Sequence, residues 1–300
     1  MPMVSVILPV HNGLPFLEAA VESVLGQTFA DFELIAIDDG SNDASASVLD
    51  SFATRDARIR VVRQANLGLI KTLNRGIELA TAPLVARMDA DDVCEPSRLR
   101  VQVEFMNANP NVVLLGGAYL LIDDASRPIR TMRPATDDRT LQEQCLLGTQ
   151  PICHPLAMMR SAALKQIGGY EEQYIAAEDL DLFLRLGEIG QLACVNDVLL
   201  RYRQHAGSVS EQKQTLQLDN QRRAVEAAFV RRGLSRTFVP PKPWRPTTAD
   251  QRFRFTLDYG WWALAENFRT TARAYARKAI AQRPWSKEAW MLMAKSLVRK

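Results

Sequence analysis

The first hundred residues alternate between short apolar runs and segments of helical period. Four runs resemble buried strands: Val4 to Val10, Phe32 to Asp38, Ile59 to Val62 and Leu84 to Met88. Between them, apolar residues recur at helical spacing, as they do from Leu14 to Leu25. Strands that are apolar on both faces are typical of a parallel sheet that helices cover on both sides. The alternation therefore predicts an open α/β sheet.

The composition is that of a globular chain with one large or two modest domains. Its 300 residues are 47% hydrophobic and 24% charged, enough to bury a sizeable core. No apolar run reaches the length of a membrane span, and no basic segment precedes the first apolar stretch, so we expect a protein that stays in the cytoplasm. Cysteines 94, 145, 153 and 194 lack the spacing of a disulfide framework or zinc site, which predicts buried or incidental thiols.

Charge divides the chain into an acidic and a basic part. Residues 201–300 contain 21 Lys and Arg against 7 Asp and Glu, whereas residues 1–200 contain 16 against 27. All five tryptophans follow residue 243, within or after a proline-rich stretch. We expect one domain over residues 1–210 and a helical extension over residues 211–300, with a linker near 239–247 and helices over 250–300. The acidic part is suited to hold a cation, and the basic part to face a polyanion or an anionic membrane.

Polar side chains follow three of the predicted strands at the point where each strand ends. They are His11 and Asn12, then Asp38 and Asp39, then Asp89, Asp91 and Asp92. In an open α/β sheet, ligands bind in the crevice beyond the carboxyl ends of the strands. We therefore expect these side chains to line one site.

The segment MDADD (Met88 to Asp92) is the strongest chemical signal. Its three carboxylates repel one another, and a fold tolerates them more readily when a cation or many donors neutralise their charge. Carboxylate oxygens with few His or Cys suit Mg²⁺ or Mn²⁺, and such an ion usually completes its shell with substrate phosphates and water. The segment thus indicates a nucleoside diphosphate ligand. The alternative is a solvated acidic loop before a helix that starts near Pro96.

Two other segments have a functional and a structural interpretation. IDDGSND (Ile37 to Asp43) is either a turn that caps the next helix or a place where Asp39 binds a nucleobase or ribose. Lys71 either faces a pyrophosphate or lies on an exposed helix face, and for Arg75 we favour the exposed face. The sequence contains neither GxGxxG after the first strand nor GxxxxGK[ST], which excludes dinucleotide dehydrogenases and P-loop nucleoside triphosphatases.

Several ordered motifs together resemble a known family. VSVILPVHN, QTFADFELIAIDDGSND, NLGLIKTLNRGI and MDADD are similar to motifs of the inverting family-2 glycosyltransferases with the GT-A fold, and the resemblance covers residues 1–210. It implies transfer of a hexosyl unit from a nucleoside diphosphate sugar, with UDP as the expected nucleotide and Mn²⁺ or Mg²⁺ as the cofactor. It also implies a saccharide or lipid-linked saccharide acceptor in cell-surface polysaccharide biosynthesis. His11 and Leu73 depart from the family, in which Tyr and Arg are common at these positions.

The resemblance also assigns roles to single residues. Around the nucleotide sugar it would place Pro9, His11, Asp39, Lys71, Asp89 and Ala90. Asp91 would be the main metal ligand, with Asp89 and His205 beside it. The alternative for His205 is that of most lone histidines, a packed or surface side chain.

Glu178 and Asp179 match the acidic pair of the family, whose Asp resembles a general base. Inverting transfer needs one carboxylate to accept the acceptor's proton while its oxygen attacks the anomeric carbon. We predict that Asp179 is this base, with Glu178 on the acceptor side and His154 either there or architectural. The alternative for each acid is that it stabilises the first turn of a helix.

The last residues, Tyr275 to Ala294, resemble one and a half tetratricopeptide-type units. Such a unit cannot bury its own apolar face, so we expect it to pack on the first domain, on a second subunit or on a membrane partner. Tryptophan beside Lys and Arg suits an anchor at the inner face of a membrane, whereas the alternative places these tryptophans in a core. No recognised nucleic-acid module accompanies the charge, so we expect no nucleic-acid partner.

Two rival functions stay open. A nucleotidyltransferase that makes an activated sugar would use the same sheet, but it predicts a basic Gly-rich loop after the first strand, and HNGLPFLE has one Gly and no Lys or Arg. An inactive scaffold would bind a partner through the helical extension, but it predicts loss of the acidic motifs, and these are present.

Overall fold

The computed structural model describes residues 1–204, 214–240 and 248–298. The expected metal ligand His205 and most of the expected linker lie outside these residues. The strands are β1 (Val4–Val10), β2 (Phe32–Asp39), β3 (Ile59–Gln64), β4 (Leu84–Arg87), β5 (Val93–Cys94), β6 (Val112–Ile122), β7 (Pro128–Met132), β8 (Met158–Arg160) and β9 (Gln191–Arg203).

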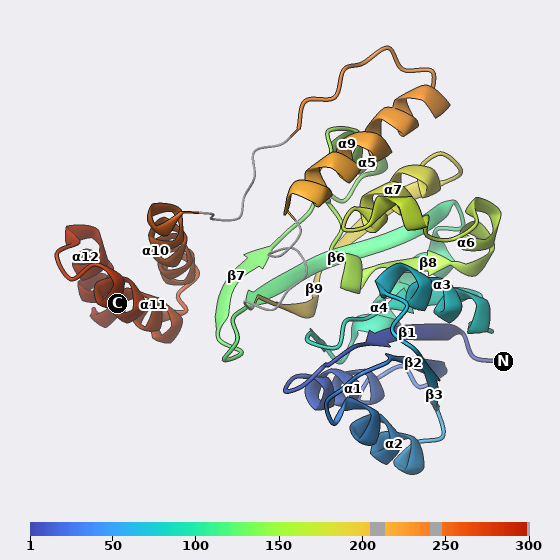
Figure 1. Ribbon diagram of the computed structural model, residues 1–300, viewed down its shortest axis with the longest axis horizontal. Coiled ribbons are helices and arrows are strands. Elements are labelled where there is room, and N and C mark those ends of the chain that lie inside the picture. The colour runs from blue at the N-terminus through green and yellow to red at the C-terminus, as the bar shows by residue number, and fades with distance from the viewer. Residues whose placement is uncertain (205–213, 241–247, 299–300) are drawn as a thin grey trace. The chain divides into compact units, whose positions relative to one another are not determined.

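The helices alternate with these strands and follow them (Figure 1). They are α1 (Leu17–Leu25), α2 (Ser45–Arg55), α3 (Leu69–Leu79), α4 (Arg98–Ala108), α5 (Asp138–Leu146), α6 (Ser161–Ile167), α7 (Glu178–Leu186), α9 (Gln214–Arg231), α10 (Ala249–Ala265), α11 (Arg269–Gln282) and α12 (Lys287–Leu297), with short 3₁₀ helices η1 (His154–Leu156) and η2 (Glu172–Tyr174).

The chain forms two compact units. Of the described residues, the first contains 1–119, 133–201 and 214–240, and the second contains 120–132, 202–204 and 248–298. Helix α9 contacts α7 and α5 and so belongs to the first unit. The domain boundary at residue 210 stays a prediction.

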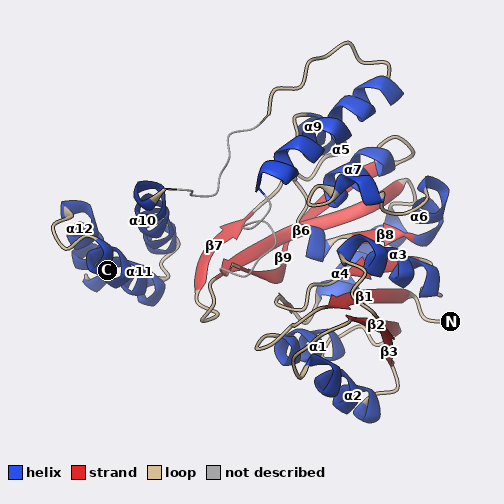
Figure 2. Cartoon of the chain, viewed as in Figure 1, coloured by secondary structure: helices blue, strands red, loops and turns tan. Residues whose placement is uncertain are grey.

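The first unit is built on a curled α/β sheet, which confirms the expected fold class (Figure 2). Its strand order is β3-β2-β1-β4-β8-β6-β9-β5. The four strands predicted from their apolar runs are parallel neighbours, since β2 lies between β3 and β1, and β1 lies between β2 and β4. Strand β8 is antiparallel to both β4 and β6. The carboxyl ends of β1, β2 and β4 therefore meet at one edge of the sheet.

Helix α3 packs closely on the central strand. A Cβ atom at Gly76 would overlap Cγ2 of Ile7, so only glycine lets α3 approach β1 to this distance. Ile70, Leu73 and Ile77 fill the contact from the same helix face and are buried. This packing fixes the start of α3 beside the carboxyl end of β2.

The second unit consists of three helices and a hairpin from the middle of the chain. Leu257, Ala276 and Leu292 are fully buried between α10, α11 and α12. Ile129 of β7 packs in a cluster with Tyr259 of α10 and Tyr275 of α11. Thr131 secures the hairpin, because its backbone N–H and its hydroxyl both donate to the Glu266 carboxylate, the latter at 2.7 Å.

The four described tryptophans differ in exposure, and the membrane role predicted for them stays a prediction. Trp261 and Trp262 are half-buried against the second unit's apolar clusters, whereas Trp285 and Trp290 are 94% and 54% exposed. Among the described helices, none has both the length and the apolar character needed to cross a bilayer. All four cysteines are free and three are buried, as expected of thiols without a disulfide framework.

Candidate active site

Asp39 ends β2 and holds the loop that leads into α3. Its Oδ1 accepts hydrogen bonds from the backbone N–H of Leu67 and from Nε2 of Gln64, both at 2.8 Å. Its Oδ2 accepts from the N–H of Gly68 at 2.9 Å, and the residue is only 4% exposed. These contacts hold the start of α3 and not that of α2, the next helix in the chain, while the contact of Asp39 with a nucleobase stays a prediction.

His11 joins the ends of two strands at this edge. Its Nδ1 lies 2.9 Å from the carbonyl oxygen of Asp39, which assigns the ring proton to Nδ1 as the donor. Nε2 can then accept from the side-chain amides of Asn12 and Asn66, each at 3.3 Å. The imidazole is exposed, whereas Pro9 is buried within β1.

The loop after β1 adjoins the loop after β4. A Cβ atom at Gly13 would lie 3.3 Å from Cβ of Ala90, so the backbone there passes close to the acidic segment. Ala90 itself is half-buried. The ends of β1, β2 and β4 therefore meet in one place, as the sequence predicted.

The acidic segment forms a compact set of oxygen donors. Carboxylate oxygens of Asp89, Asp91 and Asp92 lie within 4.8 Å of one another. Asp92 is fully buried, and Asp89 and Asp91 are half-buried. Closely spaced carboxylate oxygens of this kind fit a hard divalent cation such as Mg²⁺ or Mn²⁺.

A buried arginine at the end of β4 binds the first of these carboxylates. Arg87, 4% exposed, donates from Nη1 to Oδ2 of Asp89 at 2.6 Å and pairs through Nη2 with Oδ1 at 2.5 Å. Burial works against the guanidinium charge, but Asp89, with Asp92 and Glu178, raises the pKa of Arg87 overall. Arg87 thus connects the acidic segment electrostatically with the acidic pair of α7.

The carboxylates of the two segments also influence each other. Burial raises the pKa of Asp89 to about 6, against the lowering effect of Arg87, and the charges of Asp91 and Asp179 contribute to the rise. Asp179 lies far from Asp89 in the chain, so its contribution to the pKa of Asp89 indicates that the two acidic segments influence each other in the folded chain.

Glu178 and Asp179 open α7. Oδ1 of Asp179 accepts from Nε2 of Gln150 and from the N–H of Leu180, both at 2.8 Å. Burial raises the pKa of Asp179, and burial together with the Asp179 charge raises the pKa of Glu178 to about 7. A carboxylate whose pKa lies above its ordinary range is better suited to accept a proton near neutral pH.

The remaining predicted residues lie in structural contacts. His154 is buried, with Nε2 2.7 Å from the Tyr170 hydroxyl and its ring edge-on to Phe183. Burial lowers the pKa of His154 well below its usual range, and its role, architectural or on the acceptor side, stays a prediction. Lys71 is about half exposed, and its Nζ lies 3.5 Å from a Glu172 carboxylate oxygen.

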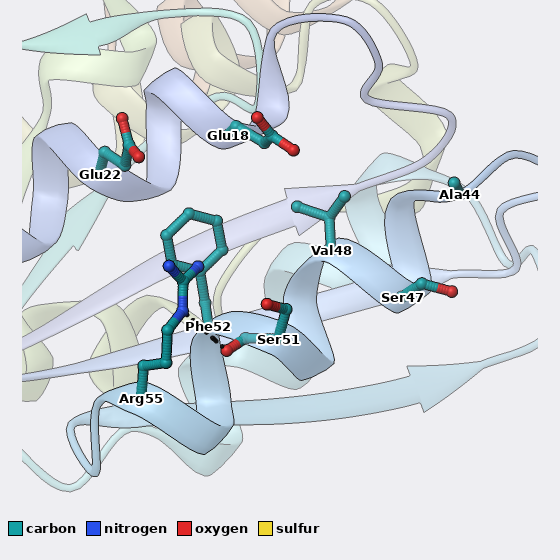
Figure 3. A pocket seen from close by; sticks show the side chains of 8 residues that line it. All are labelled: Glu18, Glu22, Ala44, Ser47, Val48, Ser51, Phe52 and Arg55. Carbon is teal, nitrogen blue, oxygen red and sulfur yellow. Dashed lines mark hydrogen bonds between the residues drawn. The ribbon is translucent and has the colours of Figure 1, made fainter.

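A separate groove of about 330 Å³ lies between α1 and α2 (Figure 3). Glu18 and Glu22 line it on α1, and Arg55 lines it on α2, where the guanidinium lies 4.4 Å from the Phe52 ring centre. Its described lining residues include none of the carboxylates at the strand ends and neither acid of α7. We therefore place the candidate active site at the carboxylates and not in this groove.

Sequence reasoning missed Arg87 and Gln150. Arg87 interrupts the apolar run LVARM and stands two residues before Asp89, which was a local signal that a buried charge pair follows. Gln150 had no such signal, because its contact with Asp179 bridges two segments that only the fold brings together.

An α/β sheet with clustered carboxylates at one strand edge, facing a second acidic pair on a helix, defines a glycosyltransferase of GT-A type. The chain belongs to glycosyl transferase family 2, whose profile matches residues 5–168. The amylovoran biosynthesis glycosyltransferase AmsE of Erwinia amylovora is 32% identical over 202 residues, which are 66% of this chain and 74% of that protein.

Two solved structures share the fold. S. aureus TarS 1–349 in complex with UDP-GlcNAc has a TM-score of 0.62 at 16% identity and covers 98% of this chain and 91% of its own. The mannosyltransferase PcManGT from Pyrobaculum calidifontis, in complex with GDP-Man and Mn²⁺, has a TM-score of 0.55 at 18% identity and covers 98% of this chain and 79% of its own.

Proposed function

We propose that this glycosyltransferase is inverting and metal-dependent, and that it moves a hexosyl unit from a UDP-sugar to a saccharide or lipid-linked saccharide in cell-surface polysaccharide biosynthesis. The observation that carries the proposal is the cluster of Asp89, Asp91 and Asp92 carboxylate oxygens within 4.8 Å of one another at the strand ends, where the charge of Asp179 also contributes to the raised pKa of Asp89. It supports a single site that holds the donor diphosphate at one acidic motif and removes the acceptor proton at the other.

The donor is assigned to the edge where β1, β2 and β4 end. There Asp39 and His11 would contact the base and ribose, beside Pro9, Ala90 and Lys71. TarS, which shares the fold, is complexed with UDP-GlcNAc, and AmsE is named for polysaccharide biosynthesis. Both facts support a UDP-sugar and a saccharide acceptor for this chain.

A divalent ion would be held by Asp91, with Asp89 beside it. Both Asp89 oxygens bond to Arg87, and the resemblance to the family assigns the direct ligand to Asp91. Such an ion would supply positive charge for the donor diphosphate, and PcManGT was solved with Mn²⁺. Gly-rich phosphate motifs are absent from the sequence, which leaves this charge to an ion and to side chains.

Asp179 is assigned as the general base. The side chain of Gln150 and the backbone of Leu180 fix its Oδ1, which leaves Oδ2 to receive the proton of an acceptor hydroxyl. The oxygen of that acceptor hydroxyl then attacks the anomeric carbon from the face opposite the diphosphate.

The function is tested by incubating the protein with Mn²⁺ and a panel of nucleoside diphosphate sugars and measuring the released nucleoside diphosphate. Release from one UDP-sugar is the expected result. Formation of pyrophosphate from a nucleoside triphosphate and a sugar phosphate would instead identify a nucleotidyltransferase, and no turnover of any donor would favour the inactive scaffold.

We predict that Asp179→Asn reduces transfer about 10²- to 10⁴-fold, because it removes the proton acceptor and leaves the donor site unchanged. The binding of UDP with Mn²⁺, measured by calorimetry, should stay within about twofold of the parent. Asp124→Asn, at an exposed carboxylate in the turn between β6 and β7, is the control and should keep full activity. Transfer by Asp179→Asn at the parent rate would reject Asp179 as the base.

A further inference from the structure

Helix α12 is apolar on two opposite faces. Ala289 and Leu292 on one face are fully buried in the second unit. On the opposite face, exposed residues recur at helical spacing and continue just past the helix end: Trp290 (54% exposed), Met291 (47%), Leu297 (56%) and Val298 (63%). Trp285, in the turn before α12, is 94% exposed. We call these five residues the outer stripe.

The outer stripe is more than a soluble helix requires. A surface helix normally buries one apolar face and exposes a polar one, and contiguous exposed apolar residues mark a contact surface. The indole N–H of Trp290 already donates to the Pro284 carbonyl at 2.8 Å, so its ring can enter an apolar medium without leaving a donor unpaired. The Trp290 side chain can therefore leave water without losing a hydrogen bond of its indole N–H.

In the sequence segment that carries the stripe, the charged residues are almost all positive. Residues 267–300 contain nine Lys and Arg and one acid, Glu288. Glu288 is occupied within the unit by Arg254, at 2.9 Å, and by the indole of Trp261. Helix α11 has no acidic residue, and Arg277, Lys278 and Lys287 are exposed.

We propose that the outer stripe docks on an anionic lipid bilayer, with the apolar side chains in the interface and the cations of α11 and α12 at the lipid headgroups. Apolar area and cationic charge together are what interfacial binding to anionic lipid requires. A second copy of the chain would cover the apolar side chains but would oppose two surfaces of like charge. This docking depends on neither the donor nor the acceptor of the proposed function.

The test is co-sedimentation of the full chain with vesicles of phosphatidylcholine alone and with vesicles that also contain phosphatidylglycerol. We expect at least about tenfold stronger binding to the anionic vesicles, weakened by added salt, since the attraction is partly electrostatic. All five tryptophans follow residue 243, so a blue shift of the intrinsic fluorescence should accompany binding.

Two pairs of variants test the parts of the surface separately. Trp285→Ser with Trp290→Ser should abolish sedimentation, whereas Val230→Ser, at an 83% exposed position of α9, should not change it. Arg277→Glu with Lys287→Glu should also abolish it, whereas Arg139→Glu with Lys165→Glu, an equal charge change on α5 and α6, should not. All replaced side chains are exposed, and unchanged circular dichroism and melting temperature would show that each variant is folded.

The proposal is overturned if the folded parent does not sediment with anionic vesicles, or if it binds neutral vesicles equally well. It is also overturned if the stripe variants still bind, or if the control variants lose binding to the same degree. If sedimentation equilibrium shows a dimer that the tryptophan variants convert to a monomer, without vesicle binding by the parent, a second copy covers the stripe instead.

Discussion

Arg87 shows how one buried side chain can connect two motifs that are distant in sequence. Its guanidinium forms two hydrogen bonds to the Asp89 carboxylate, and the charge of Glu178 also raises the pKa of Arg87. A buried cation between carboxylates costs desolvation free energy, which the ion pair offsets only while its geometry is intact. Arg87, in turn, lowers the pKa of Asp89 against the rise that burial causes.

We predict that Arg87→Met lowers the free energy of unfolding by about 1–3 kcal/mol at neutral pH, because it leaves the half-buried Asp89 carboxylate without its partner. Urea denaturation measures this loss. Adding Asp89→Asn to the same chain should restore part of it, since the lone charge is then gone. Strictly additive losses in the double variant would contradict a direct pair.

A second residue-scale prediction concerns pH. Because the pKa of Glu178 is raised from 4.5 to about 7 in the folded chain, the folded state holds this proton more tightly than the unfolded state. The contribution of Glu178 to stability therefore falls as the pH rises through this range and is least above it.

Glu178→Gln removes that penalty, so its stability relative to the parent should improve between pH 5 and pH 8, by on the order of 2 kcal/mol. Melting temperatures at the two pH values measure the change. The exposed Glu172→Gln is the control and should show no such trend. An equal difference at both pH values would mean that Glu178 is not held protonated by the fold.

At the scale of elements, the apolar pattern predicts where the strands near the site begin, but it does not predict which strands pair with one another. The predicted strands at Val4, Phe32, Ile59 and Leu84 begin at those residues, because parallel strands buried on both faces give unbroken apolar runs. Their strand-end acids could be predicted for the same reason. The antiparallel pairing of β8 with β4 and β6 could not, because it depends on contacts between segments far apart in the chain.

Helix α3 offers a test of element packing. In an exposed helix, Gly→Ala gains about 1 kcal/mol, but at Gly76 the added methyl group would overlap Ile7 of β1. We predict that Gly76→Ala instead lowers the stability by about 1–3 kcal/mol. Thermal melting measures this, with the exposed Ser47→Ala of α2 as a control that should change little. An unchanged or higher melting temperature for Gly76→Ala would contradict this packing.

At the scale of the whole molecule, ligand binding should raise the free energy of unfolding. The proposed site needs positive charge to hold a diphosphate between carboxylates, so UDP and Mn²⁺ should each bind better when the other is present. The joint binding of a metal ion and a nucleoside diphosphate could be predicted from MDADD alone. The burial of these carboxylates within the first unit could not.

We predict that UDP with Mn²⁺ raises the melting temperature more than the sum of the two alone, with about 3 kcal/mol of stabilisation at a hundredfold excess over the Kd. Asp91→Asn should abolish the added shift, whereas Asp124→Asn should keep it. Differential scanning fluorimetry measures both. A full shift with UDP alone would argue against a metal-dependent donor site.

The second unit draws residues 120–132 from the middle of the chain and residues 248–298 from its end. Ile129 packs against Tyr259 and Tyr275 there, and the Thr131 hydroxyl donates to Glu266. The second unit thus combines two segments that are distant in sequence, the hairpin segment 120–132 and the helices of residues 248–298, which pack on each other. A chimera that transplants only the terminal helices to another enzyme would leave their tyrosine face bare, so a working exchange has to carry the hairpin along with them.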